Sequence, residues 1–158
     1  MTTIRPHATI ATQWAVERIA ANMREWDRRE IFATRGDDGP DRLAAGVLGT
    51  VGPKWVAWLG DEPVAAIGCA AMWPGLMSPW CFATDKFRQT HLLLTRLAKQ
   101  VIIPMAREAG THRLEVKTME GHTDAQAWLK RAFGAHHEAT HPGFGRNRET
   151  FFTYVLRL

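Results

Sequence analysis

The sequence contains no glycine between Gly75 and Gly110, although the chain has 13 glycines in all. It also has a single tyrosine, Tyr154, against seven tryptophans, and only two cysteines, Cys69 and Cys81. Two cysteines exclude the dense disulfide framework of small secreted domains. They fall on neighbouring predicted strands, so spacing alone does not exclude one bond between them. We expect reduced, buried thiols.

Long apolar runs are absent as well. No stretch reaches the roughly 20 apolar residues that a membrane span needs, and residues 1–11 lack the apolar core of a signal peptide. With 46% hydrophobic and 23% charged residues, the chain has the balance of one compact domain over residues 1–158. Its 20 basic and 16 acidic residues are dispersed, which gives a net charge of +4 without a basic run. We therefore expect neither a membrane nor a specific nucleic acid as a partner.

Hydrophobic periodicity and turn residues divide the chain into strands and helices. The predicted strands cover 3–8, 54–60, 64–73, 77–84, 112–118 and a terminal hairpin whose last arm is 151–158. The predicted helices cover 13–33 with Thr12 as the cap, a short segment through 43–48, 85–110 with a bend at Pro104, and 123–133. This order predicts an α/β fold with a single mixed, mostly antiparallel sheet and helices on both faces.

The order of elements resembles the GNAT (GCN5-related N-acetyltransferase) fold over the whole chain, and the segment 127–135 resembles its late helix. A closer resemblance is to the GNAT-like proteins of tailed phages, the family that includes an internal virion protein of short-tailed phages. The matching segments are 27–31, 62–65, 78–85, 122–124 with 128–130, and 143–145 with 151–152. This resemblance implies a role in the virion or its assembly, with other virion or assembly proteins as partners.

The GNAT resemblance also implies where a cofactor would bind. Active members start the central helix with Arg/Gln-x-x-Gly-x-Gly/Ala, whose bare backbone holds a pyrophosphate. The nearest register here runs from Arg88 to Leu93 and puts His91 and Leu93 at the glycine positions. Asp85, interpreted as the N-cap of this helix, would repel a phosphate. We therefore expect no cofactor, with the alternative that Lys86 and Arg88 hold acetyl-CoA.

Catalytic residues of the GNAT type are hard to find. The resemblance places a tyrosine acid in the late helix, where this chain has Leu129 or Lys130, and the only tyrosine is Tyr154. The strand 64–73 has no carboxylate to order a water. Glu115 is the remaining candidate base, and a surface carboxylate on an alternating strand explains it better. We expect no catalytic residue and no acetyl transfer.

Metal binding is not expected either, because His137 and His141 on an extended strand lie about 13 Å apart. Two surfaces are candidates for contact with a protein partner. Trp73, Met77 and Trp80 surround the bend at 74–79, where an exposed patch and a core position are both open, and Arg146 and Arg148 lie at the tip of the terminal hairpin.

The sequence-based hypothesis is thus a phage structural or morphogenesis protein that acts through protein contacts. It would be found in the virion or in the cytoplasm of a bacterial host, and a homo-oligomer is left open. An acetyl-CoA-dependent N-acetyltransferase with an atypical cofactor loop is the alternative. A small protein that binds and inhibits a host factor is a third hypothesis.

Overall fold

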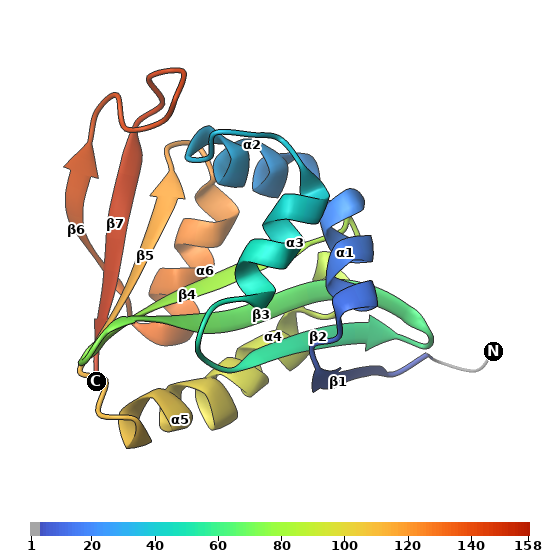
Figure 1. The fold of residues 1–158 in the computed structure, drawn as a ribbon. Helices are drawn as coiled ribbons and strands as arrows, with labels where there is room; N and C mark the ends of the chain where they lie inside the picture. Colours follow the sequence, from blue (N-terminus) through green and yellow to red (C-terminus); the bar gives the residue numbers. More distant parts are fainter. Residues whose placement is uncertain (1–3) are drawn as a thin grey trace.

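A computed structural model describes residues 4–158, and within this range the strands form one seven-stranded sheet (Figure 1). The sheet order is β1-β2-β3-β4-β5-β7-β6, and all neighbours are antiparallel except the parallel pair β4 and β5. The strands are β1 (Pro6–Ile10), β2 (Lys54–Leu59), β3 (Glu62–Trp73), β4 (Leu76–Ala83), β5 (Arg113–Met119), β6 (His136–His141) and β7 (Phe151–Arg157). Thr3, where the first strand was predicted to begin, lies outside the described residues. The predicted mixed sheet is confirmed.

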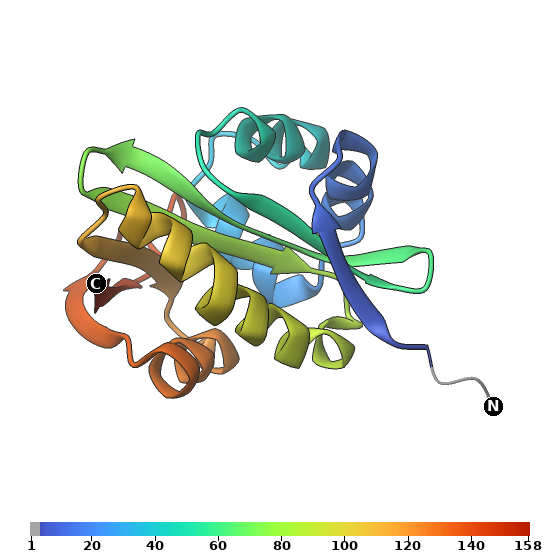
Figure 2. The ribbon, with the colours of Figure 1, turned by 90° about the horizontal axis from the view of Figure 1, so that it is seen from below.

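Helices cover both faces of this sheet, as predicted (Figures 1 and 2). One face carries α1 (Gln13–Ala21), α2 (Glu25–Ala33) and α3 (Pro40–Leu48), and its core includes Ile19, Leu43 and Phe82. The other face carries α4 (His91–Leu97), α5 (Ile103–Glu108) and α6 (Thr123–Phe133), and its core includes Leu94 and Ile102. Within residues 4–158, no helix combines the length and the apolarity that crossing a membrane would take.

The predicted first helix, 13–33, is wrong as a single helix. The chain breaks after Ala21 and resumes as α2 at Glu25. At the break, the Arg24 N–H donates to the Ala83 carbonyl at the end of β4 (2.8 Å), and Met23 is buried. A backbone bond to a strand 59 residues away overrides the local helical period, because it takes the N–H out of helical geometry.

The central helix also begins later than predicted. It starts at His91 with Thr90 at the N-cap position, after a 3₁₀ turn at Phe87–Gln89, so the expectation that Asp85 is the N-cap is wrong. A π-helical turn at Ala98–Ile102 joins α4 to α5, just before Pro104. Proline lacks the N–H that an α-helix needs and crowds the preceding turn, so the wider turn sits where the bend was predicted.

The parallel pair of strands separates soon after it forms. β4 and β5 are paired only at Leu76↔Arg113 and Met77↔Leu114, although β4 continues to Ala83 and β5 to Met119. Beyond these two pairs the strands diverge, and the middle of the sheet opens.

Candidate functional site

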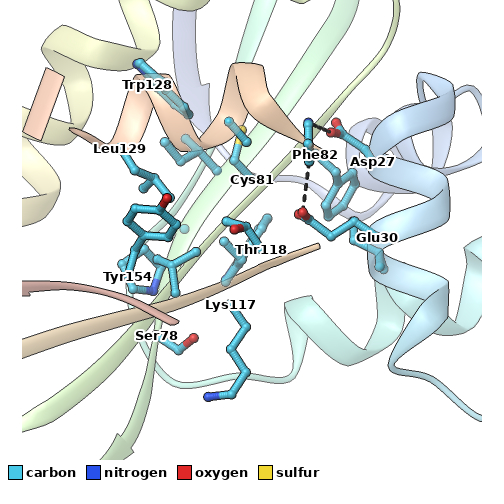
Figure 3. Close-up of a pocket in the computed structure, with 18 of the residues that line it drawn as sticks. Asp27, Glu30, Ser78, Cys81, Phe82, Lys117, Thr118, Trp128, Leu129 and Tyr154 are labelled. Carbon is cyan, nitrogen blue, oxygen red and sulfur yellow. Dashed lines mark hydrogen bonds and ion pairs between the residues drawn. The ribbon is translucent and has the colours of Figure 1, made fainter. Parts of the chain in front are cut away.

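A cavity of about 520 Å³ occupies this opening and reaches both faces of the sheet (Figure 3). On one face, α2 and α3 contribute to its walls. On the other face the walls are apolar and come from the central helix, β5, α6 and β7, with Ala98, Ile102, Leu114, Trp128 and Leu129 among them. Mostly apolar cavities of this size with a few polar groups are typical of small-molecule sites.

The edge of β4 that faces the cavity offers free backbone groups. Thr84 N–H donates to Val64 C=O (2.9 Å), and hydrogen-bonded pairs alternate along an antiparallel ladder, so Cys81 and Ala83 point their N–H and C=O away from β3. Ala83 is satisfied by α2, because its N–H donates to Asp27 Oδ2 (2.8 Å). Proline at position 79 has no N–H. Between Ser78 and Ala83, Cys81 therefore has the one free N–H on this edge.

Four side chains on the cavity wall have buried polar atoms without a hydrogen-bond partner in residues 4–158. These atoms are Trp80 Nε1, Thr118 Oγ1, Arg35 Nε and Arg24 Nε, and of the four only Arg24 Nε has an ion-pair partner, Asp27. A buried polar atom left unpaired costs about 1–3 kcal/mol. Native structures leave few of them unless a water, ion or ligand completes the bond. The wall is therefore suited to a ligand that has polar groups of its own.

A buried group of charged side chains closes the α2 side of the opening. Asp27 is 2% exposed, and Arg24 Nε lies 2.8 Å from its Oδ2. Glu30 Oε2 accepts from the Met119 N–H (2.8 Å) and from His122 Nδ1 (2.9 Å), and His122 Nε2 lies 3.8 Å from Asp27 Oδ1. Burial raises the pKa of Asp27, and the guanidinium of Arg24 works against that shift. Figure 3 shows the carboxylates of Asp27 and Glu30 at the edge of the cavity.

The sequence-based patch at the bend 74–79 is not formed. Trp73 is 61% exposed, but Met77 is buried against the central helix. Trp80 stacks on Phe82 on the opposite face of β4 and lines the cavity. Successive strand residues point to opposite faces, so Met77 and Trp80 cannot share a surface. Contact of Trp73 with a partner stays a prediction.

The tip of the terminal hairpin lies against the end of α2, since the Arg146 N–H donates to Ala33 C=O (2.8 Å). The Arg146 side chain forms an ion pair with Asp38. Arg148 is exposed and has a positive φ of 67°. Their role in contacting a partner also stays a prediction.

The start of the central helix lies apart from the cavity. Leu92 is 63% exposed, His91 is half-buried with Nδ1 3.2 Å from Arg88 C=O, and neither lines the cavity. At the positions that the resemblance gives to glycines, His91 is half-buried and Leu93 packs against the core on the α4–α6 face. The cavity between the strands stays open. Lys86, the other cation at this entrance, is already paired with Glu62.

Sequence reasoning missed the residues that line the cavity. Glu115, its candidate base, is absent from the wall and pairs with Lys117 and Arg113, which lower its pKa. Tyr154 was set aside because it lies on the last strand, yet it is buried in the cavity wall beside Leu129 (Figure 3). Asp27 and Glu30 fall within the matching segment 27–31 and His122 within 122–124, and this was the only signal that the sequence offered.

Both cysteines are free thiols, as predicted, but only Cys69 is fully buried and Cys81 is half-buried. Burial raises the pKa of Cys69 and of Cys81 to about 12. A thiol with so high a pKa is a poor nucleophile at neutral pH. Among residues 4–158 no group of three or more His, Cys, Asp or Glu side chains is arranged to hold a metal ion.

The fold is that of solved GNAT-fold acetyltransferases. The ribosomal-protein-alanine N-acetyltransferase of Brucella melitensis matches with a TM-score of 0.74 and 17% identity, over 96% of this chain and 99% of that one. RimL, a ribosomal L7/L12 alpha-N-protein acetyltransferase in complex with CoA, matches with a TM-score of 0.73 and 10% identity, over 98% and 94%. The Salmonella typhimurium protein yncA, described as a candidate acetyltransferase and solved with acetyl-CoA, matches with 0.69 and 15%, over 97% and 94%. At these identities the likeness establishes the fold.

Neither models of known protein families nor curated protein sequences match the chain. The structural likeness contradicts the hypothesis of a non-enzymatic virion protein without a cofactor. The similar structures are acetyltransferases, two of them hold acetyl-CoA or CoA, and nothing in the comparisons supports a phage family. The hypothesis rested on the glycine-free helix entrance and on the phage resemblance, and the sequence does not show the opening in the sheet.

Proposed function

We propose that this protein is an acetyl-CoA-dependent N-acetyltransferase. The observation that carries the proposal is the separation of β4 and β5 around a cavity that exposes the backbone edge of β4. A splayed parallel pair leaves strand-like hydrogen-bonding groups without a partner in the centre of a sheet. An extended arm with amide groups can complete that edge as a missing strand does.

The residues of the slot fit the acyl-bearing arm of acetyl-CoA. The walls on the α4–α6 side are apolar. The backbone of Cys81 offers a hydrogen-bond donor and an acceptor, and Thr118 Oγ1 and Trp80 Nε1 have no hydrogen-bond partner within residues 4–158. The phosphate end is different, because His91 and Leu93 stand where the resemblance places glycines. Binding should therefore depend on the arm more than on the phosphates.

Acetyl-CoA supplies an acetyl thioester, whose carbonyl carbon is attacked by an amine. In this chain, the Cys81 N–H is placed to donate to an oxygen that gains negative charge at the separated edge of β4, and such donors are worth about 10²–10³ in rate. The apolar walls exclude water from the thioester. Tyr154 is the one phenol in the chain and lies in the wall, where it can give a proton to a departing sulfur.

Two measurements test this function. Acetyl-CoA should raise the melting temperature of the purified protein, since a ligand that binds only the folded state stabilises it by mass action. Incubation with acetyl-CoA and a set of amines should release free CoA thiol in amounts equal to the acetylated amine found by mass spectrometry. Binding without any transfer, or no binding at millimolar acetyl-CoA, would overturn the proposal.

A further inference from the structure

The cavity has a polar end next to α2, which lies outside the part proposed to bind the arm of acetyl-CoA. Asp27, Glu30, Ile31, Thr34 and Arg35 all line it, at spacings of three and four residues. Such spacing places side chains on one face of a helix and of the turn that continues it. The opposite end is apolar, so a second, charged reactant would be accommodated at the α2 end.

His122 at this end has the arrangement of an oriented base. Its Nδ1 donates to Glu30 Oε2 (2.9 Å), which leaves Nε2 as the atom that can accept a proton. Trp26 stacks on the ring (centroids 5.5 Å apart), so the ring is held on its face as well as at its edge. Asp27 Oδ1, 3.8 Å from Nε2, can stabilise the imidazolium once the proton is taken. Arg24 beside Asp27 and Asp124 at the start of α6 are the other charges near this group.

Arg35 supplies the opposite charge at the same end. Its Nε is buried on the cavity wall, and within residues 4–158 its side chain makes no hydrogen bond or ion pair, whereas Arg24 is paired with Asp27. A partly buried guanidinium without a carboxylate is costly, and it matches the planar shape of a carboxylate or phosphate. Glu30 lies on α2, Arg35 lies two residues beyond the end of that helix, and both line the same cavity. This arrangement suits one small molecule with an amine at one end and an anionic group at the other.

We propose that the α2 end of the cavity is the acceptor site for a small amine that carries a carboxylate, as an amino acid does. Arg35 binds the carboxylate, and His122, oriented by Glu30, takes one proton from the ammonium group. The freed nitrogen lone pair forms the C–N bond as the acyl C–S bond breaks. Tyr154 gives its proton to the departing sulfur, and the second nitrogen proton restores the Tyr154 phenol. The proton on His122 returns to solvent. This inference rests on the proposed acetyl transfer.

The test compares the twenty amino acids with their carboxamides as acceptors for acetyl-CoA. The wild type should prefer an amino acid over its carboxamide by at least tenfold in kcat/KM. Arg35→Gln should remove that preference by raising KM for the amino acid and leaving KM for the carboxamide unchanged. Arg42→Gln is the matched control, because Arg42 is exposed on α3 and is absent from the cavity wall. Equal KM values for both forms in the wild type would overturn the acceptor class.

The base is tested through the pH profile. His122→Gln should lower kcat by about 10²–10⁴ and abolish the fall in rate on the acid side of the profile. Glu30→Gln should lower kcat less, because it loosens the ring without removing it. A His122→Gln variant that keeps both kcat and the acid limb would overturn the role of His122. Melting curves establish that each variant folds, and Arg35→Gln decides the acceptor class even if His122→Gln does not.

Failure of this inference and failure of the proposed function give different results. If acetyl-CoA raises the melting temperature and a peptide amine is acetylated while no amino acid is, the acceptor class is wrong and acetyl transfer stands. If acetyl-CoA neither binds nor is consumed, both are wrong.

Discussion

In the proposed function, acetyl-CoA would contact the protein at two places, the open edge of β4 and the entrance of the central helix. The two places differ in how much of the backbone they expose. At β4 the backbone edge lacks a neighbouring strand, because β5 pairs with it at only two positions. Beyond those pairs, α2 satisfies the backbone of Ala83 alone. At the helix entrance, His91 and Leu93 occupy the positions that the GNAT resemblance gives to glycines. The comparison teaches that a strand edge can be exposed by strand divergence alone, whereas exposing a helix terminus requires particular residues.

The largest effect is expected at the strand edge. Cys81→Pro removes the free N–H without breaking the ladder to β3, and position 79 on the same edge is already proline. Acetyl transfer should fall by about 10²-fold or more, by the loss of one donor at the reacting oxygen. Cys81→Ala, which keeps the backbone N–H, should lower the rate of acetyl transfer far less. Steady-state rates for the two variants check this, and equal losses would assign the effect to the side chain.

The entrance of the central helix should contribute less to the binding of acetyl-CoA than the strand edge does. The dissociation constants of acetyl-CoA and S-acetylpantetheine, which lacks the nucleotide, should differ by less than tenfold, or about 1.4 kcal/mol. Calorimetric titration of both ligands measures the difference. An advantage of a hundredfold or more for acetyl-CoA that is lost in Arg88→Glu would show that side chains replace the missing glycines.

The two thiols test whether acetyl-CoA binds in the cavity, because Cys81 lines the cavity and Cys69 does not. Burial raises both pKa values to about 12, so iodoacetamide at pH 8 should alkylate the folded protein at least a hundredfold more slowly than the unfolded chain. Acetyl-CoA should further lower the alkylation rate of Cys81 and leave the alkylation rate of Cys69 unchanged. Peptide mass spectrometry follows both rates. Equal protection of both would place the ligand elsewhere.

The same pKa values give a stability prediction with a definite sign. The folded-state pKa of each thiol lies above the unfolded value of 9.0, so the folded chain holds more protons between pH 9 and about 12. The free energy of unfolding should therefore fall as the pH rises through that range. Denaturant titrations of the wild type and of Cys69→Ala at pH 8 and pH 10.5 measure it. A wild type whose stability does not decrease relative to the variant would contradict the prediction.

The smallest effect is expected at Trp73. Because this side chain is largely exposed at the tip of β3, Trp73→Ala should change stability by less than about 0.5 kcal/mol and leave acetyl transfer unchanged. Trp80→Ala, on the cavity wall and packed on Phe82, should lower both. Thermal melts and rates of the two variants give the result. A loss of transfer on changing Trp73 would extend the site beyond the cavity.

Much of the fold could be predicted from local pattern. Helix α6 was predicted with its observed ends, 123–133, because Gly134 in the left-handed region stops it (φ 68°). Most strands were placed within two residues by alternating apolar positions and turn residues. The single helix over 13–33 was wrong because nothing local signals that Arg24 bonds to the end of β4.

The candidate site could not be predicted in the same way. The sequence named the segments that contain Asp27, Glu30 and His122, but not that Glu30 and His122, 92 residues apart, share a hydrogen bond. It could not show that Tyr154 on the last strand faces the cavity. Side chains from α2, β5, α6 and β7 meet only after the sheet is ordered.

By itself the sequence determined the type and order of the elements, the mixed sheet and the absence of glycine at the central helix entrance, since periodicity, caps and turns are local properties. The tertiary structure alone decided that β4 and β5 part after two pairs, that a cavity forms between them and that a histidine and two carboxylates border it. These features depend on contacts between segments distant in the chain, and the free energy of such contacts has no counterpart in any local pattern.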